Sequence, residues 1–304
     1  MQVASRLGCR RSLKNYIKHT IMNKVIFIGE LTLNVSLQPD GNATTRVGDR
    51  AVGAAMLDGR MGVETIFVGE AGADAVGDHI VSQLSSAKVD TASIDRFTEG
   101  ATPVRITSDQ SAPDKSVTHT SYPAEPVNPV WPRINEGDVV VFGSYMALDK
   151  RNHPRVIELV SHARARKAHV VYLPYFEPGQ VTRITRVMPE VFESLEAATL
   201  VVATVDDLAA LYPGVAPDAA FRDHIKFHCP RCLVLDRAGL KMRFFDGDES
   251  WTLNCHPTEG NDFDWTVGAI AGVTRALVEG VRDPDDIMAK ANETAHSNLA
   301  DSLK

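Results

Sequence analysis

The chain has 304 residues, 44% of them hydrophobic and 23% charged, which is the composition of a globular protein with one large domain. Its net charge of −7 argues against a nucleic-acid-binding protein, because phosphate contacts need a clustered basic surface. No apolar run approaches the roughly 20 residues of a membrane-spanning helix, so we expect a cytoplasmic protein without a membrane partner.

Residues 1–21 differ from the rest of the chain. They contain no acidic residue and several basic ones, namely Arg6, Arg10, Arg11, Lys14 and Lys18. Such a leader is typical of a targeting peptide, but a secretory signal also needs an apolar run of about 7–15 residues, which this segment lacks. We therefore predict a disordered extension, with Met22 as the natural start of the protein.

From Met22 to residue 121 an alternation of strands and helices gives way to strands alone. Strands are predicted at 25–29, 33–37 and 65–69, and helices at 52–61 and 75–87. Short strands follow at 104–107 and 117–121, with a polar loop and no helix between them. This second pattern predicts a β-hairpin and not a crossover unit.

Beyond the hairpin, spaced prolines at 123, 126, 129 and 132 predict an extended connector. Strands are then predicted at 139–142, 169–172, 200–203 and 233–235, helices at 152–167, 184–195, 205–211, 217–227, 264–280 and 284–302, and a hairpin at 242–253. Repeated strand and helix units predict a parallel sheet covered on both faces, with right-handed crossovers. Ligands bind such sheets outside the carboxyl ends of the strands.

Cys229 and Cys232 form a C-x-x-C pair, and Cys255 lies further along the chain. With neighbouring histidines they are candidate zinc ligands, since zinc takes Cys and His side chains tetrahedrally. Cys232, however, begins the apolar run Cys232–Leu235, and a single C-x-x-C is a weak metal signal. The interpretation we favour is a buried strand start, in a protein without a disulfide framework.

A turn rich in Gly, Asn and Asp at 256–264 runs into a predicted helix. Gly268 and Gly272 lie four residues apart on this helix and allow a neighbouring element to approach its backbone closely. An Asn or Asp at the start of the helix can accept its free N–H groups, and the same groups can instead bind phosphate oxygens. The turn is therefore either a helix cap or an anion site.

The turn resembles the T-x-G-A-G-D-x-F-x-x-G motif of the ribokinase (PfkB) family of sugar kinases, through Thr258, Gly260 and Gly268 in one register. A shift by one residue places Asp264 at the position of the catalytic Asp. The resemblance implies that Asp264, or Asp262, takes the proton from the sugar hydroxyl. It also implies that Gly260 and Asn261 lie near the transferred phosphate.

The resemblance extends over residues 23–303 and is nearest to a Bacteroidetes-type fructokinase-like branch. Its landmarks are the segments 72–77, 136–145, 172–176 and 225–230. It implies a three-layer α/β sandwich with a mostly parallel central sheet and a small β lid, built from about 31–37 and 103–121, over the sugar site. A homodimer through the lid is a further possibility that it raises.

The family's sugar-binding positions carry other residues in this chain. Asn34 stands for an Asp at the end of the first strand, and Asp49 and Gly53 stand for a Gly and the Asn of a G-G-x-x-x-N segment. Tyr175 stands for the Asn of D-P-N-x-R, and Glu177 reverses the charge of its Arg. The Tyr175 ring can fill the vacated sugar pocket.

The segment that organises magnesium in the family is approached by Asp206 and Asp207, which could still hold Mg²⁺ through water. Two functions follow. The first is an ATP-dependent and Mg²⁺-dependent kinase that phosphorylates a sugar hydroxyl, with sugar and nucleotide as its small-molecule partners. The second is a catalytically inactive relative, without these cofactors, that acts as a ligand sensor, a regulator or a partner of an active paralogue. The family resemblance favours the first function, and the altered motifs favour the second.

Overall fold

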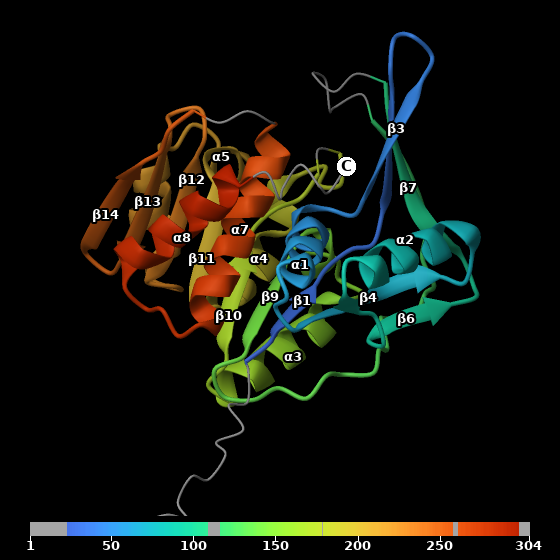
Figure 1. The fold of residues 1–304 in the computed structure, drawn as a ribbon, viewed down its shortest axis with the longest axis horizontal. Helices are drawn as coiled ribbons and strands as arrows, with labels where there is room; N and C mark the ends of the chain where they lie inside the picture. Colours follow the sequence, from blue (N-terminus) through green and yellow to red (C-terminus); the bar gives the residue numbers. More distant parts are fainter. Residues whose placement is uncertain (1–22, 109–115, 178, 258–260, 298–304) are drawn as a thin grey trace, which may run out of the picture.

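A computed structural model describes residues 23–108, 116–177, 179–257 and 261–297, which form a main sheet covered by helices and a separate small sheet (Figure 1). The parallel strands of the main sheet are β1 (Val25–Ile28), β4 (Thr65–Gly72), β5 (Val89–Asp90), β6 (Ile94–Phe97), β9 (Val139–Gly143), β10 (His169–Leu173), β11 (Leu200–Thr204) and β12 (Arg231–Asp236). Two antiparallel strands extend its edge, β13 (Lys241–Asp246) and β14 (Glu249–Asn254). The order is β14-β13-β12-β11-β10-β9-β1-β4-β5, and β6 pairs with β4.

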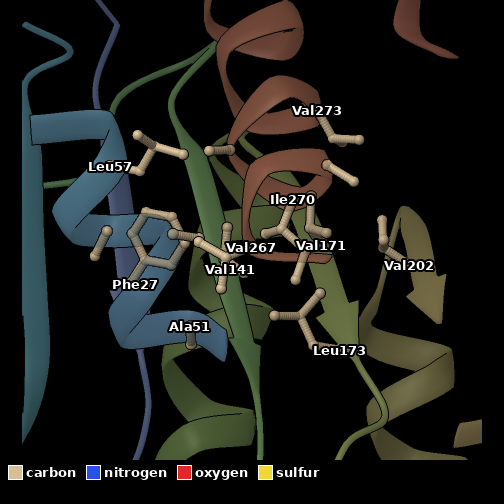
Figure 2. Close-up of a cluster of buried hydrophobic side chains, with 14 of the residues drawn as sticks. Phe27, Ala51, Leu57, Val141, Val171, Leu173, Val202, Val267, Ile270 and Val273 are labelled. Atoms are coloured by element: carbon tan, nitrogen blue, oxygen red, sulfur yellow. The ribbon is translucent and has the colours of Figure 1, made fainter. Parts of the chain in front are cut away.

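Alternate residues of each strand point to opposite faces of this sheet, and each face has its own hydrophobic core. Phe27, Val141 and Val171 face α1 (Arg50–Arg60), α2 (Ala75–Ser86), α7 (Asp262–Val278) and α8 (Pro284–His296) (Figure 2). Ile28 and Phe142 face α3 (His153–Ala165), α4 (Met188–Ala197), α5 (Val205–Leu211) and α6 (Pro217–Ala220). The predicted α/β sandwich with a mostly parallel sheet and helices on both faces is confirmed.

Helices α7 and α8 pack at very short range because α7 presents glycines to its neighbour. A Cβ atom on Gly268 would lie 2.7 Å from the Cα of Ala295, and one on Gly272 would lie 2.6 Å from the Cα of Ala291. Real Cβ atoms do not approach a backbone this closely, so only glycine fits at these two positions. The close approach predicted from the helix sequence is therefore present between α7 and α8.

The small sheet has the order β3-β2-β7-β8, with β2 (Leu33–Leu37), β3 (Ala43–Val47), β7 (Ala101–Thr107) and β8 (Val117–Ser121). It projects beyond the main sheet in Figure 1 and is called the lid below. The predicted lid segments contain β2, β7 and β8, and β7 and β8 pair antiparallel as the expected hairpin. Strand β3 was not predicted, because its sequence Ala43-Thr44-Thr45-Arg46-Val47 is too polar to show an apolar pattern.

Other boundaries differ from the prediction in places. The helix predicted at 217–227 is α6 followed by a π-helical turn at Phe221–Ile225. The helix predicted to reach residue 302 is described only to His296. In the proline connector, Val127 and Pro129 are buried, whereas Asn128, Val130 and Trp131 are exposed, so the segment packs one edge against the body. The predicted disordered extension at 1–21 lies outside the described residues.

Candidate functional site

Several residues that the sequence singled out, among them Asp49, Tyr175, Asp207 and Asp264, lie near the carboxyl ends of β1, β10 and β11, where the first turns of α1 and α7 meet the lid. We call this region the cleft and define it by residues from these elements: Glu30, Arg46, Asp49, Arg50, Arg105, Ser144, Tyr175, Glu177, Asp207 and Asp264. In a mostly parallel sheet this edge is where ligands bind.

Asp49 is the N-cap of α1 and is 9% exposed. Its Oδ1 accepts hydrogen bonds from the backbone N–H groups of Ala51 at 2.9 Å and Val52 at 3.2 Å. Burial raises the pKa of the Asp49 carboxyl, against these hydrogen bonds, which lower it. The nearby Ser144 side chain also interacts with this carboxyl and helps to lower its pKa. Asp49 therefore caps the helix and faces Ser144 across the cleft.

Asn34 and Gly53, two further predicted sugar contacts, have structural roles in the described fold. Asn34 Nδ2 donates to the carbonyl oxygen of Gly48 at 2.8 Å, which ties β2 to the turn before α1. A Cβ atom on Gly53 would lie 2.8 Å from Val267 Cγ2, so this glycine lets α1 and α7 pack together. Neither arrangement shows a contact reserved for a sugar.

An ion pair in the cleft joins Arg50 to Asp207. Arg50 Nη1 lies 2.9 Å from Oδ1 and 2.7 Å from Oδ2 of Asp207, and both side chains are largely buried. Asp207 is also the fourth residue of a capping box with Thr204 at the start of α5. Burial lowers the pKa of Arg50, but Asp207, Tyr175 and Asp49 together outweigh this and the net pKa is raised. This carboxylate is therefore already neutralised.

Tyr175 lies directly against this ion pair. The Arg50 guanidinium carbon is 4.1 Å from the centroid of the Tyr175 ring, which is a cation–π distance. Burial raises the pKa of Tyr175 to about 12, so the phenol stays protonated at neutral pH. Its hydroxyl donates to Glu177, which in turn is ion-paired with Arg105 of the lid strand β7. Tyr175 thus joins the body of the protein to its lid.

Glu30 continues this polar network at the end of β1. It accepts hydrogen bonds from the Tyr122 hydroxyl at 2.7 Å and from Gln180 Nε2 at 2.8 Å. Burial raises the pKa of Glu30, and Asp49 and Asp149 raise it further. The adjacent cavity, which Glu30, Tyr122 and Tyr145 help to line, has a volume of about 10 Å³. This is room for about one water molecule.

At the start of α7, Asn261 is the N-cap and Asp264 is its partner. Asn261 Oδ1 accepts from the Asp264 backbone N–H at 2.8 Å, and Asn261 Nδ2 donates to Asp264 Oδ2 at 3.0 Å. Asp264 is 7% exposed, whereas the Asp262 side chain is 88% exposed and bonds to Arg237. Of the two predicted bases, only Asp264 lies inside the protein. Gly260 lies outside the described residues.

Asp206, the second predicted magnesium ligand, is exposed on the first turn of α5. No group of three or more His, Cys, Asp or Glu side chains that could hold a metal ion occurs within the described residues. Asp207 alone among the two lies in the cleft, where it is bound to Arg50.

The three cysteines among the described residues do not belong to the set that defines the cleft. Cys232 starts the buried strand β12, and Cys229 and Cys255 are also buried as free thiols. Burial raises the pKa of Cys229 to about 11, which keeps its thiol protonated and unreactive at neutral pH. This arrangement agrees with the structural interpretation of the C-x-x-C pair.

The three cleft arginines were not singled out from the sequence. Arg46 lies on the unpredicted strand β3, with its guanidinium carbon 3.6 Å from the centroid of the Phe263 ring. Arg105 lies on β7 and is 6% exposed. Of the three, only Arg50 could have been placed in the cleft from the sequence. It directly follows Asp49, the N-cap of α1, and therefore lies at the helix end that faces the carboxyl edge of the sheet.

The comparisons with known proteins agree with this description. Residues 22–228 match the model of the pfkB family carbohydrate kinases. No curated protein matches the sequence. Within the described residues, none of the helices has the length and apolar character needed to cross a membrane.

Solved structures with the same fold cover nearly the whole chain. Aminoimidazole riboside kinase from Salmonella enterica, complexed with aminoimidazole riboside and an ATP analogue, has a TM-score of 0.78 at 14% identity, covering 93% of this chain and 94% of that one. Fructokinase from Vibrio cholerae O395, bound to fructose, ADP and calcium, has a TM-score of 0.78 at 13% identity, with 92% of each chain covered. At these identities the likeness establishes the fold alone.

Proposed function

We propose that this chain, which belongs to the pfkB family of carbohydrate kinases, keeps the family's fold without phosphorylating a free sugar. In this proposal it acts as a ligand-responsive or regulatory protein. The observation that carries this proposal is the occupied cleft. Arg50, Tyr175 and Asp207 fill the space at the carboxyl ends of β10 and β11 with one another.

The size of the remaining space supports the proposal. The cavity that Arg50, Tyr175 and Asp207 help to line has a volume of about 10 Å³. Ligand pockets usually measure about 300–1,000 Å³, whereas this one admits about one water molecule. A sugar can enter only if the Tyr175 ring leaves its place against Arg50.

The charges in the cleft support it as well. Phosphoryl transfer depends almost wholly on positioning and electrostatic stabilisation, with metal ions neutralising the phosphates. Asp207, the buried candidate for the magnesium site, has both carboxylate oxygens bound to Arg50. Recruiting this carboxylate to Mg²⁺ would leave a buried guanidinium without its partner, at a cost of about 3–5 kcal/mol.

One observation favours the second candidate function, an ATP-dependent and Mg²⁺-dependent sugar kinase. Asp264 is a buried acid in the first turn of α7, as a general base in this family would be, and its carboxylate is oriented by Asn261. In this alternative Asp264 receives the proton of the sugar hydroxyl. The Arg50 and Tyr175 side chains would then have to move before each turnover.

A turnover assay separates the two functions. The purified protein is incubated with ATP, Mg²⁺ and a panel of hexoses and pentoses, beside an Asp262→Asn/Asp264→Asn double variant. We expect equal, background turnover from both proteins and no thermal shift with nucleotide. Turnover by the natural chain that the double variant lacks would establish the kinase and contradict our proposal.

A further inference from the structure

The two sides of the main sheet end in strands of different length. One side is divided between two short strands, β5 with two residues and β6 with four. The other side ends in β14, which has six residues and lies at the outer edge of the main sheet in Figure 1. An unpaired edge strand presents a row of backbone N–H and C=O groups that can pair with another strand. In the described part of the main sheet, β14 offers the longest such row.

Strand β14 lacks the usual protections of an edge strand. Edge strands are commonly blunted by Pro, by Lys or by a β-bulge. The sequence of β14, Glu-Ser-Trp-Thr-Leu-Asn, contains neither Pro nor Lys, and each of its residues pairs with one residue of β13 without a bulge. A regular edge of this kind is a template for a further strand.

The outward backbone groups of β14 belong to Ser250, Thr252 and Asn254. Cys255, the residue after the strand, donates its N–H to the Leu240 carbonyl oxygen at 2.7 Å, so this N–H points toward β13. Successive residues of a strand point these groups to opposite sides, so those of the three named residues point away from β13. None of the described residues hydrogen-bonds to these outward groups.

The side chains of β14 alternate between a polar face and an apolar one. Ser250, Thr252 and Asn254 are exposed, whereas Trp251 and Leu253 are half-buried against the core that α8 covers. A second strand laid along this edge would shield the part of Trp251 and Leu253 that water still reaches. Burial of apolar surface would therefore add to the backbone hydrogen bonds.

We infer that β14 pairs antiparallel with β14 of a second copy of this chain, so that the two main sheets become one continuous sheet. A two-fold axis at Thr252 places Thr252 opposite Thr252 of the other copy, and Ser250 opposite Asn254 of the other copy. Every outward residue of the strand then has a partner, whereas an axis at Trp251 would leave Asn254 without one. The inference does not depend on the proposed function, because β14 contributes no residue to the cleft.

The side chains suit this register. Trp251 of one copy lies opposite Leu253 of the other, in the non-hydrogen-bonded position where cross-strand side chains approach most closely. The central Thr252 pair is a favourable cross-strand pair as well. Glu249 is the only charged residue of the strand and lies opposite Cys255 of the other copy, so like charges do not meet.

The oligomeric state of the full chain tests the inference. One pair of strands is a small interface, and interfaces that bury less than about 1,200 Å² are typically weak. We therefore expect a reversible dimer with a Kd on the order of ten micromolar. Sedimentation equilibrium at protein concentrations from about 1 to 200 μM covers the transition from monomer to dimer.

Two variants of β14 identify the interface. Thr252→Pro removes the central outward N–H and should raise the Kd at least about tenfold, and the monomer should still fold because an edge strand tolerates Pro where its N–H faces solvent. Ser250→Lys/Asn254→Lys places lysines opposite each other and should act likewise. Val117→Lys/Ser121→Lys, with the same spacing on the exposed lid strand β8, is the control and should leave the Kd unchanged. Circular dichroism checks the fold of each variant.

Cysteine variants test the register. The Cα atoms of a hydrogen-bonded antiparallel pair lie about 5.5 Å apart, within the span of a disulfide. With a copper–phenanthroline oxidant, Thr252→Cys should form a disulfide-linked dimer. Ser250→Cys should not, because its counterpart lies roughly 13 Å away along the strand direction. The natural chain, oxidised in the same way, gives the background from its own cysteines.

Several outcomes would overturn the inference. These are a monomer at every concentration, a dimer that both β14 variants leave intact, and a dimer that only the β8 control loses, which would place the second copy at the lid. Cross-linking of Ser250→Cys in place of Thr252→Cys would contradict the register. The turnover assay reads none of these quantities, so the proposed function and this inference fail separately.

Discussion

Helices α1 and α7 each contain two chemically different regions. Beyond their first three residues, small residues such as Gly53 and Gly272 allow close packing, and the neighbouring side chains are buried and apolar. At their first turns, the same two helices supply Asp49, Arg50 and Asp264 to the cleft. The comparison shows that apolar packing sets the position of each helix, so charged residues can be exchanged at the helix starts while the fold is kept.

The largest expected effect tests the packed region. Gly272→Val places a branched side chain where even a Cβ atom would lie 2.6 Å from the Cα of Ala291 and 2.5 Å from the Lys290 carbonyl oxygen. Helices α7 and α8 must then separate, and we expect a loss of about 3 kcal/mol or more in the free energy of unfolding. Urea denaturation measures it, and Ala209→Val, on an exposed face of α5, is the control.

The next effect tests the cleft. Arg50→Met leaves the buried Asp207 carboxylate without its cation, and we expect a loss of about 3 kcal/mol in unfolding free energy. Asp207→Asn leaves the guanidinium unpaired and should cost a similar amount. The double variant should lose less than the sum of the two, because neither unpaired charge remains. Strict additivity in the same urea titrations would show that the two side chains do not interact.

This contrast also explains how far the sequence predicts the fold. Strands β1, β9 and β10 are continuous apolar runs because helices cover both of their faces. The apolar run therefore predicts both the strand and its burial from the sequence alone. Strand β3 has no such pattern, because its side chains are mostly exposed and its pairing with β2 comes from backbone hydrogen bonds. Its location was therefore seen only in the structure.

The cleft was predictable in its location and less so in its contacts. The positions of Asp49, Tyr175 and Asp264 follow from turns and strand ends that the sequence marks. The partners of these residues come from distant segments, as when Arg50 meets Asp207 across 157 positions. Such pairs are set by the tertiary arrangement, and a single sequence carries no local pattern for them.

A pH-dependent effect concerns Asp58, a fully buried carboxyl between α1 and α7 that accepts a hydrogen bond from the Thr274 hydroxyl at 2.7 Å. Burial raises its pKa well above the ordinary value of 3.8. The folded protein therefore holds a proton that the unfolded chain releases, and stability falls as the pH rises from about 3.8 toward the folded pKa. Asp58→Asn cannot ionise, so its advantage over the natural chain should grow across that window by up to about 1.4 kcal/mol per pH unit.

Urea titrations of Asp58→Asn and of the natural chain between pH 4 and pH 8 measure this difference. Asp78→Asn, at an exposed carboxylate on α2, is the control and should follow the natural chain closely. A constant difference between Asp58→Asn and the natural chain across the range would show that Asp58 ionises in the folded protein much as it does in the unfolded one. The packed region would then tolerate a charge, and its contrast with the cleft would weaken.

The smallest expected effect is that of Asp262, and it distinguishes this exposed acid from Asp264, the buried acid at the start of α7. Its side chain is 88% exposed and pairs with Arg237 at 2.7 Å, and surface ion pairs of this kind contribute about 0–1 kcal/mol. We expect Asp262→Asn to change the free energy of unfolding by about 0.5 kcal/mol or less. Asp264→Asn should cost more, about 1–3 kcal/mol, because Asp264 is buried and its carboxylate accepts a hydrogen bond from Asn261. Equal responses of the two variants would mean that the boundary between surface and cleft does not fall between these residues.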